Sequence, residues 1–267
     1  MLFRSMEERD IQIRGYVLRL PLDVLVVASA NPEDYTNRGR IITPLKDRFG
    51  AEIRTHYPIE LDDEVAVIRQ EGQLVAGVPP VILEILARYT RALRQSPAVN
   101  QTSGVSARFA IAGAETVAAA ALRRASVRGE DEAVARIIDL DAAVDVLAGK
   151  IEFESGEEGR EQDVLDHLLR MATAEAVRAH FHGLDMGPLV AALDGHATVT
   201  TGELVTAREF LHNLPSLNGS SLYDDISERL GAENDGQRAA AVELALEGLY
   251  LARRISKESD DEETIYG

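Results

Sequence analysis

The segment ASANPEDYTNRGRIITPLKDRFG, residues 28–50, begins at the end of the apolar run LDVLVVAS, residues 22–29. This run is rich in β-branched and aliphatic residues and is bounded by prolines, which predicts a strand buried on both faces. A strand that only fills a core does not need to end at Asn31. Nor does it need to be followed by a segment dense in Arg, Asp and Gly. The segment therefore indicates a strand whose end has a chemical role.

Short elements are predicted on both sides of this strand. The stretch IQIRGYVLRL, residues 11–20, alternates apolar and polar residues around a Gly-containing turn, which predicts a β-hairpin. Residues 39–49 are predicted to form a short helix with Pro44 in its first turn. Residues 51–57, AEIRTHY, are predicted to form another short strand, which Pro58 closes.

The remainder of the chain is predicted to be mostly helical. The predicted helices cover residues 62–70, 79–95, 106–128, 130–148, 160–183 and 236–255, with short helices around a turn within 184–215. Gly129 is placed at a helix end and at a domain boundary. The last residues, 256–267, read SKESDDEETIYG and are expected to be an acidic, disordered tail.

Composition excludes several classes of protein. The 267 residues include no Cys, which excludes disulfides, thiolate metal sites and Cys nucleophiles. No apolar run is long enough for a membrane span and no signal peptide is recognisable, so a cytoplasmic protein without a membrane span is expected. The net charge is −17, with 9 basic and 8 acidic residues in 1–58 but 19 and 37 in 59–267. Such acidity argues against nucleic-acid binding, which requires phosphate neutralisation.

The pattern of elements and charges resembles that of the AAA+ ATPases. More narrowly, MEERDIQIRGYVLRLPLDVLVVASANPED, residues 6–34, and the segment 28–58 resemble the ATPase subunit of magnesium chelatase and its chelatase-like relatives. The resemblance is specific over 6–58, weaker over 59–128 and loose beyond 129. It implies an α/β fold class: a partial P-loop AAA+ core over 1–58 and a helical lid over 59–128. A mostly α C-terminal region over 129–255 and the acidic tail follow.

The resemblance assigns catalytic roles to two residues of the opening segment. Asn31 matches sensor 1, an amide that can donate to a phosphate oxygen and accept from the attacking water without adding charge. Arg48, in LKDRFG, matches the arginine finger that reaches the nucleotide of a neighbouring subunit and stabilises the transferring phosphoryl group. The alternatives are an Asn-Pro turn at Asn31 and a surface arginine paired with Asp47.

Further positions follow from the same resemblance. Arg108, in SGVSARFAIAG, matches sensor 2, which binds the γ-phosphate of its own subunit's nucleotide and couples the lid to nucleotide state. The alternative for Arg108 is an ordinary exposed helix residue. Asp47 and Arg54 are expected at a subunit interface. The hairpin at 11–20 is expected to project toward a pore or partner, unless it is a simple connector.

The chain lacks one element that the resembled family requires. No G-x-x-x-x-G-K-[ST] sequence, the loop that cradles phosphates, occurs in the 267 residues. No apolar strand ending in an acidic pair precedes residue 6 to hold Mg²⁺. An N-terminally truncated form of a longer ATPase is therefore expected, whose ATP and Mg²⁺ site is mostly missing here. We also note an HxH pair, His180 and His182, whose spacing alone is poor evidence for a metal site.

Two functions are therefore open. The first is an ATP-hydrolysing, chelatase-like motor subunit in a homo-oligomeric ring, expected to be a hexamer. Asn31 and Arg108 would act in cis and Arg48 in trans, and the motor would remodel a partner protein with a von Willebrand A domain. Magnesium insertion into protoporphyrin is the activity of the chlorophyll-pathway members, but the motifs do not specify the substrate. The second is a non-catalytic AAA+-derived interaction or regulatory module.

Overall fold

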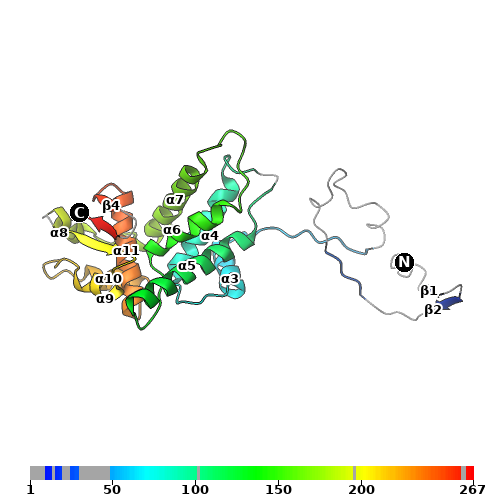
Figure 1. Cartoon of the computed structure of the whole chain (residues 1–267), viewed down its shortest axis with the longest axis horizontal. Coiled ribbons are helices and arrows are strands. Elements are labelled where there is room, and N and C mark those ends of the chain that lie inside the picture. The colour runs from blue at the N-terminus through cyan, green and yellow to red at the C-terminus, as the bar shows by residue number, and fades with distance from the viewer. Residues whose placement is uncertain are drawn as a thin grey trace. The chain divides into compact units, whose positions relative to one another are not determined.

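A computed structural model describes residues 10–13, 16–19, 25–29, 49–100, 103–194, 197–259 and 263–267. The chain divides into two compact units, Met1–Tyr57 and Pro58–Gly267, and each is described by itself (Figure 1). The division falls one residue from the expected end of the α/β region at 58. Within the described ranges, every helix is too short or too polar to cross a lipid bilayer.

The first unit contains a β-hairpin, as the sequence predicts. Strands β1 (Asp10–Ile13) and β2 (Tyr16–Arg19) are antiparallel, with Asp10 opposite Arg19 and Ile13 opposite Tyr16. The two residues between the strands lie outside the described part of the chain. Tyr16, next to this turn, is 81% exposed.

The prediction of a buried strand at 22–29 is wrong for its described residues, 25–29. These residues have no strand structure, and Leu25 and Val27 are 91% and 83% exposed. The predicted strand at 51–57 is also wrong, since this segment has no regular structure and Ile53 is exposed. Among the described residues no neighbouring strand pairs with either segment, so their apolar side chains have no sheet to cover. The predicted helix at 39–49 lies outside the described residues except for Phe49.

The second unit is a helical assembly with a small sheet. Figure 1 shows α3 to α7 grouped together, and α8 to α11 with the sheet beside them. The helices are α3 (Leu61–Glu71), α4 (Pro80–Gln95), α5 (Ala107–Arg128), α6 (Leu140–Ala148), α7 (Glu161–Phe181), α8 (Gly187–Asp194), α9 (Ala207–His212), α10 (Leu222–Arg229) and α11 (Asp235–Leu251), with a 3₁₀ turn η2 (Ile137–Asp139). The strands are β3 (Val199–Gly202), β4 (Lys257–Ser259) and β5 (Glu263–Tyr266).

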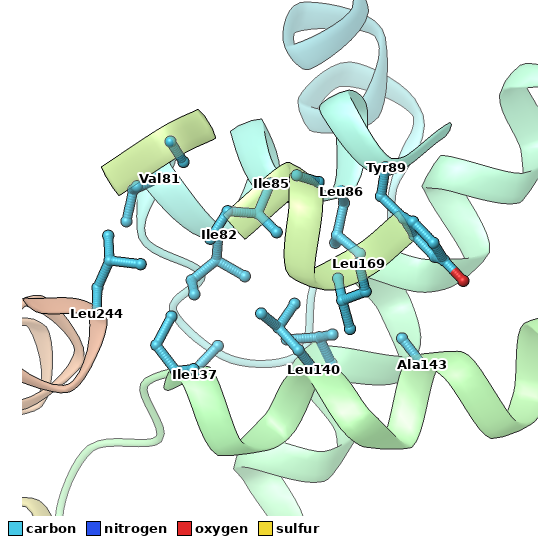
Figure 2. Close-up of a cluster of buried hydrophobic side chains, with 14 of the residues drawn as sticks. Val81, Ile82, Ile85, Leu86, Tyr89, Ile137, Leu140, Ala143, Leu169 and Leu244 are labelled. Carbon is cyan, nitrogen blue, oxygen red and sulfur yellow. The ribbon is translucent and has the colours of Figure 1, made fainter. Parts of the chain in front are cut away.

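Helix α4 lies at the centre of the core. It begins at Pro80, where the missing N–H costs no helical hydrogen bond, and its buried residues recur at helical spacing, including Ile82, Ile85 and Leu86. Figure 2 shows that the α4 side chains face residues from η2, α6 and α7, with Leu244 of α11 at one end. The helices on both sides of Gly129 therefore share one hydrophobic core, although a domain boundary was expected there.

Helix α5 ends as predicted, but the helix predicted at 130–148 is shorter than expected. Gly129 has a left-handed conformation (φ 68°, ψ 34°) that caps α5. The following segment pairs with Gly77 instead of coiling: Gly77 donates to the Ala133 carbonyl and Ala135 donates to the Gly77 carbonyl. These tertiary hydrogen bonds hold residues 133–135 in an extended path, and α6 begins only at Leu140, after the 3₁₀ turn η2.

The extended segment carries Arg136, whose side chain is fully buried. Its Nη1 donates to the Val205 carbonyl (2.7 Å), its Nη2 to Thr201 Oγ1 (2.6 Å), and its Nε to Glu243 of α11 (2.9 Å). The guanidinium also lies 5.5 Å from the centre of the Phe210 ring. One arginine therefore connects the segment after α5 to β3, α9 and α11.

The expectation of a disordered tail is wrong for residues 256–259 and 263–267. Strand β5 pairs antiparallel with both β3 and β4, giving the order β3-β5-β4. Tyr266 is 2% exposed and donates from its hydroxyl to Glu247 of α11 (2.7 Å), to which Lys257 Nζ also donates (2.8 Å). Burial of this tyrosine and the ladder hydrogen bonds outweigh the acidic composition.

Replacement of Arg136 by Met tests its role in the fold. The change leaves Glu243 charged and buried without its partner, so we expect a loss of about 3–5 kcal/mol in the free energy of unfolding. Urea unfolding should show that Arg136→Met/Glu243→Leu is less destabilised than the sum of the two single changes. Additive losses, or a loss below about 1 kcal/mol in Arg136→Met, would contradict this role.

A second, less buried cluster joins α4 to α7. Glu84 accepts from Arg88 Nε (2.8 Å) and lies 2.7 Å from His180 Nε2, while Arg88 also contacts Glu175. Burial raises the pKa of Glu84, but the hydrogen bonds and charges of His180 and Arg88 outweigh it and hold the pKa below its usual value. The stabilisation is therefore present above the usual pKa and is lost as the pH falls through the lowered one.

We accordingly expect Glu84→Gln to be less stable than the wild type at neutral pH. The difference should shrink as the pH falls to about 3, where the native carboxyl also becomes protonated. Thermal unfolding across this pH range measures it. A stability difference that grows on acidification would show that the carboxylate does not stabilise the pairing of α4 with α7.

Candidate functional site

The candidate site is the N-terminal end of α5, where Arg108 lies in the first helical turn. Its side chain is exposed, and it makes no hydrogen bond or ion pair within the described part of the chain. The N-cap residue, Ser106, makes no side-chain capping bond. A free guanidinium and the positive end of a helix of 22 residues therefore lie together, an arrangement that attracts an anion.

The loop before α5 is held at several points. Arg94 of α4 donates from Nε to the Val105 carbonyl (2.8 Å), and the Val105 side chain is buried. Gly104 has φ +64° and donates to the Asn100 carbonyl (3.2 Å). These contacts fix the path of the chain three residues before Arg108.

The same loop also pairs with the segment after α6. Val99 and Phe153 form an antiparallel bridge, flanked by hydrogen bonds from Asn100 to the Glu152 carbonyl (2.8 Å) and from Glu154 to the Ala98 carbonyl (2.9 Å). The Ser103 hydroxyl also donates to the Glu152 carboxylate. The loop is therefore also held by the segment after α6.

The residue after Arg108 anchors the helix end in the core. Phe109 is 3% exposed, and its ring centre lies 5.8 Å from that of Tyr89, which is fully buried. Burial raises the pKa of Tyr89, so its hydroxyl stays neutral. The backbone on both sides of Arg108 is therefore anchored, by the buried Phe109 and by the loop that Arg94 contacts. The guanidinium of Arg108 makes no described contact.

Arg94 also forms a buried ion pair with α3. Its Nη1 lies 2.8 Å from Oε1 of Glu64, a side chain that is 2% exposed. Neither Glu64 oxygen has a hydrogen-bond partner among the described residues. Charge attraction alone therefore holds this carboxylate.

A cavity of about 660 Å³ lies near this loop but has a different chemistry. Its lining combines carboxylates and small polar groups with an apolar floor: Asn100, Ala148, Ile151, Phe153, Glu154, Ser155, Glu158 and Glu161. The acidic lining repels phosphate, so an anion is attracted to Arg108 and not to the cavity.

The predicted site residues fall in different parts of the chain. Asn31, Asp47 and Arg48 lie outside the described residues. Arg54 is exposed in the first unit and pairs only with nearby Glu52 (3.2 Å) among the contacts described for it, and Arg108 belongs to the second unit. Of the predicted site residues, the structure therefore describes two, one in each unit.

The two histidines have separate surroundings. His180 pairs with Glu84, and the backbone carbonyls of His180 and His182 both accept from Arg229. Within the described ranges, no group of three or more His, Asp or Glu side chains is arranged to hold a metal ion.

The sequence analysis missed Glu64 and Arg94. A signal was available for Glu64, because it lies one turn before Ile68 and shares the buried face of α3. The partial burial of Arg94 could not be predicted, because the local sequence does not distinguish it from an exposed arginine at a helix end.

Comparison of the chain with protein-family models, curated proteins and solved structures finds no match. The resemblance to the AAA+ ATPases therefore stays a prediction from the sequence.

The free side chain of Arg108 leads to a stability prediction. Arg108→Ala should change the free energy of unfolding by no more than about 0.5 kcal/mol, because no described contact is lost. Arg124→Ala, on the same helix, removes a buried guanidinium that contacts Asp139 and Glu130 and should cost about 3–5 kcal/mol. Chemical unfolding of both variants provides the comparison. A large loss in Arg108→Ala would indicate a structural role for this residue.

Proposed function

We propose that this chain is part of a chelatase-like AAA+ ATPase subunit that uses ATP hydrolysis to remodel a partner protein. Arg108 contacts the γ-phosphate of the nucleotide in its own subunit, and Arg48 reaches the nucleotide of the neighbouring subunit. Asn31 positions the attacking water. The subunits form a closed ring with head-to-tail interfaces, across which each Arg48 reaches the nucleotide of the next subunit.

The observation that carries the proposal is the combination of residues 28–50 with Arg108. In the segment, Asn31 follows an apolar run and Arg48 precedes Gly50 by two residues, the order that the resemblance requires. Arg108 adds an exposed guanidinium at a helix N-terminus whose backbone is held by Arg94. These groups supply the polar positioning and positive charge that phosphoryl transfer needs.

Two parts of an ATPase must come from outside these residues. The chain has no phosphate-binding loop, and no described group of side chains is arranged to hold Mg²⁺. We therefore assign no step to a metal held by this chain. Residues 25–29 form no strand, so the role of Asn31 is proposed from the sequence resemblance alone.

A second candidate is a non-catalytic interaction or regulatory module. The absence of a phosphate-binding loop favours it, because such a module does not need to bind nucleotide. The acidic balance of residues 59–267 suits a basic partner surface. This candidate leaves Arg48 and Arg108 without a role in turnover, which separates it from the first.

Subunit mixing tests the proposal, using the assembled ATPase that contains this chain. Arg48→Ala alone should lower turnover by about 10³–10⁵-fold while ATP binding persists, because the finger acts on the transition state. Asn31→Ala alone should also be inactive. A mixture of the two variants should regain activity, since about one quarter of randomly formed interfaces combine an intact Asn31 with a neighbour's intact Arg48.

Arg178→Ala is the control, because Arg178 is an exposed arginine in the last turn of α7 with no proposed part in the chemistry or in the subunit interface. It should keep its turnover. If mixing restores nothing, Arg48 does not act in trans. Wild-type turnover in Arg48→Ala would favour the non-catalytic module.

A further inference from the structure

We propose that Glu64 and Arg94 are positioning residues for Arg108, and that α4 thereby controls where this guanidinium lies. The inference rests on the proposed function, because it concerns the contact of Arg108 with a polyphosphate. It assigns a role to the buried Glu64 and the partly buried Arg94.

The first step of the argument is the cost of burying Glu64. Its side chain is 2% exposed, and among the described residues the compensating contact is the charge of Arg94. A well-packed apolar pair at the same positions would often be as stable or more stable. Core stability alone therefore does not account for this ion pair.

The second step is the shape of Arg94. One edge of its guanidinium faces Glu64 on α3, and its Nε donates to the Val105 carbonyl just before α5. A planar guanidinium fixes the angle between two such partners, whereas a lysine ammonium does not. Arg94 consequently sets the position of the loop relative to α3 and α4.

The third step is the short distance along the chain from this clamp to Arg108. Val105 lies three residues before Arg108, and Phe109 is anchored in the core beside Tyr89. Because Val105 and Phe109 are both held in place, the Cα atom of Arg108 between them has a defined position. A polyphosphate then meets a group whose backbone is already ordered, which lowers the entropy cost of binding.

Arg91 provides a matched control on the same helix. It lies one turn before Arg94 and donates from Nη2 to the Ile59 carbonyl (2.9 Å), ahead of α3. Like Arg94, Arg91 donates a guanidinium hydrogen bond to a backbone carbonyl. Its acceptor, however, lies outside the loop before Arg108. Arg91→Lys should therefore leave the anion affinity unchanged.

The test uses inorganic tripolyphosphate as the probe and the 267-residue chain. Amide NMR spectra follow residues 105–110 during titration, and hydrogen exchange of the same amides is compared with that of α11. We expect weak, saturable binding by the wild type and loss of binding in Arg108→Ala. In Arg94→Lys, binding should weaken about 3–10-fold and loop exchange should accelerate, while α11 is unchanged.

Glu64→Leu/Arg94→Met is the second variant, which removes the clamp without leaving a buried charge unpaired. It should stay folded and lose affinity as Arg94→Lys does. Wild-type affinity in both variants would overturn the positioning role, while the loss in Arg108→Ala would still support the proposed function. Equal behaviour of the wild type and Arg108→Ala would overturn the proposed contact of Arg108 with phosphate, and the positioning role with it.

Discussion

The second unit depends on the requirement that a buried guanidinium must have its donors paired. Arg136 is fully buried and satisfies this requirement with Glu243, Thr201 and the Val205 carbonyl. These partners come from α11, β3 and the segment before α9, which are far apart in the sequence. An unpaired buried charge is highly unfavourable, so these contacts favour the arrangement that brings the partners of Arg136 together. One side chain thereby links the α5–α6 connection to β3, to the segment before α9 and to α11.

Most helices of the second unit were predicted from helical periodicity in the sequence. The predictions that failed concern segments whose structure is set by tertiary contacts. The amphipathic spacing of α4 and the left-handed Gly129 after α5 are local signals, and the structure confirms them. The extended path at 130–136 is not local, since it is set by Gly77 and Glu243. Tyr266 similarly makes a strand from an acidic segment by pairing with Glu247 of α11. Composition could not reveal either partner.

The candidate site was predictable in part. Arg108 was selected from the resemblance of SGVSARFAIAG to the sensor 2 segment, and helical periodicity predicts its place near the start of α5. The supporting residues of Arg108 could not be predicted, because Glu64 and Arg94 meet only after α3 packs on α4. The sequence also does not show which arginines have hydrogen-bond acceptors inside the unit and which do not. Arg94, Arg124 and Arg136 direct donors to acceptors inside the unit, whereas Arg108 makes no described internal contact.

The central claim is that Arg48 and Arg108 meet a nucleotide from two adjacent subunits. The most direct measurement is an experimental structure of the native assembly that contains this chain, bound to a non-hydrolysable ATP analogue. The account predicts Arg108 of one subunit and Arg48 of its neighbour within hydrogen-bonding distance of the same γ-phosphate, with Asn31 beside the water position. A nucleotide bound away from both arginines, or an assembly that binds none, would contradict it.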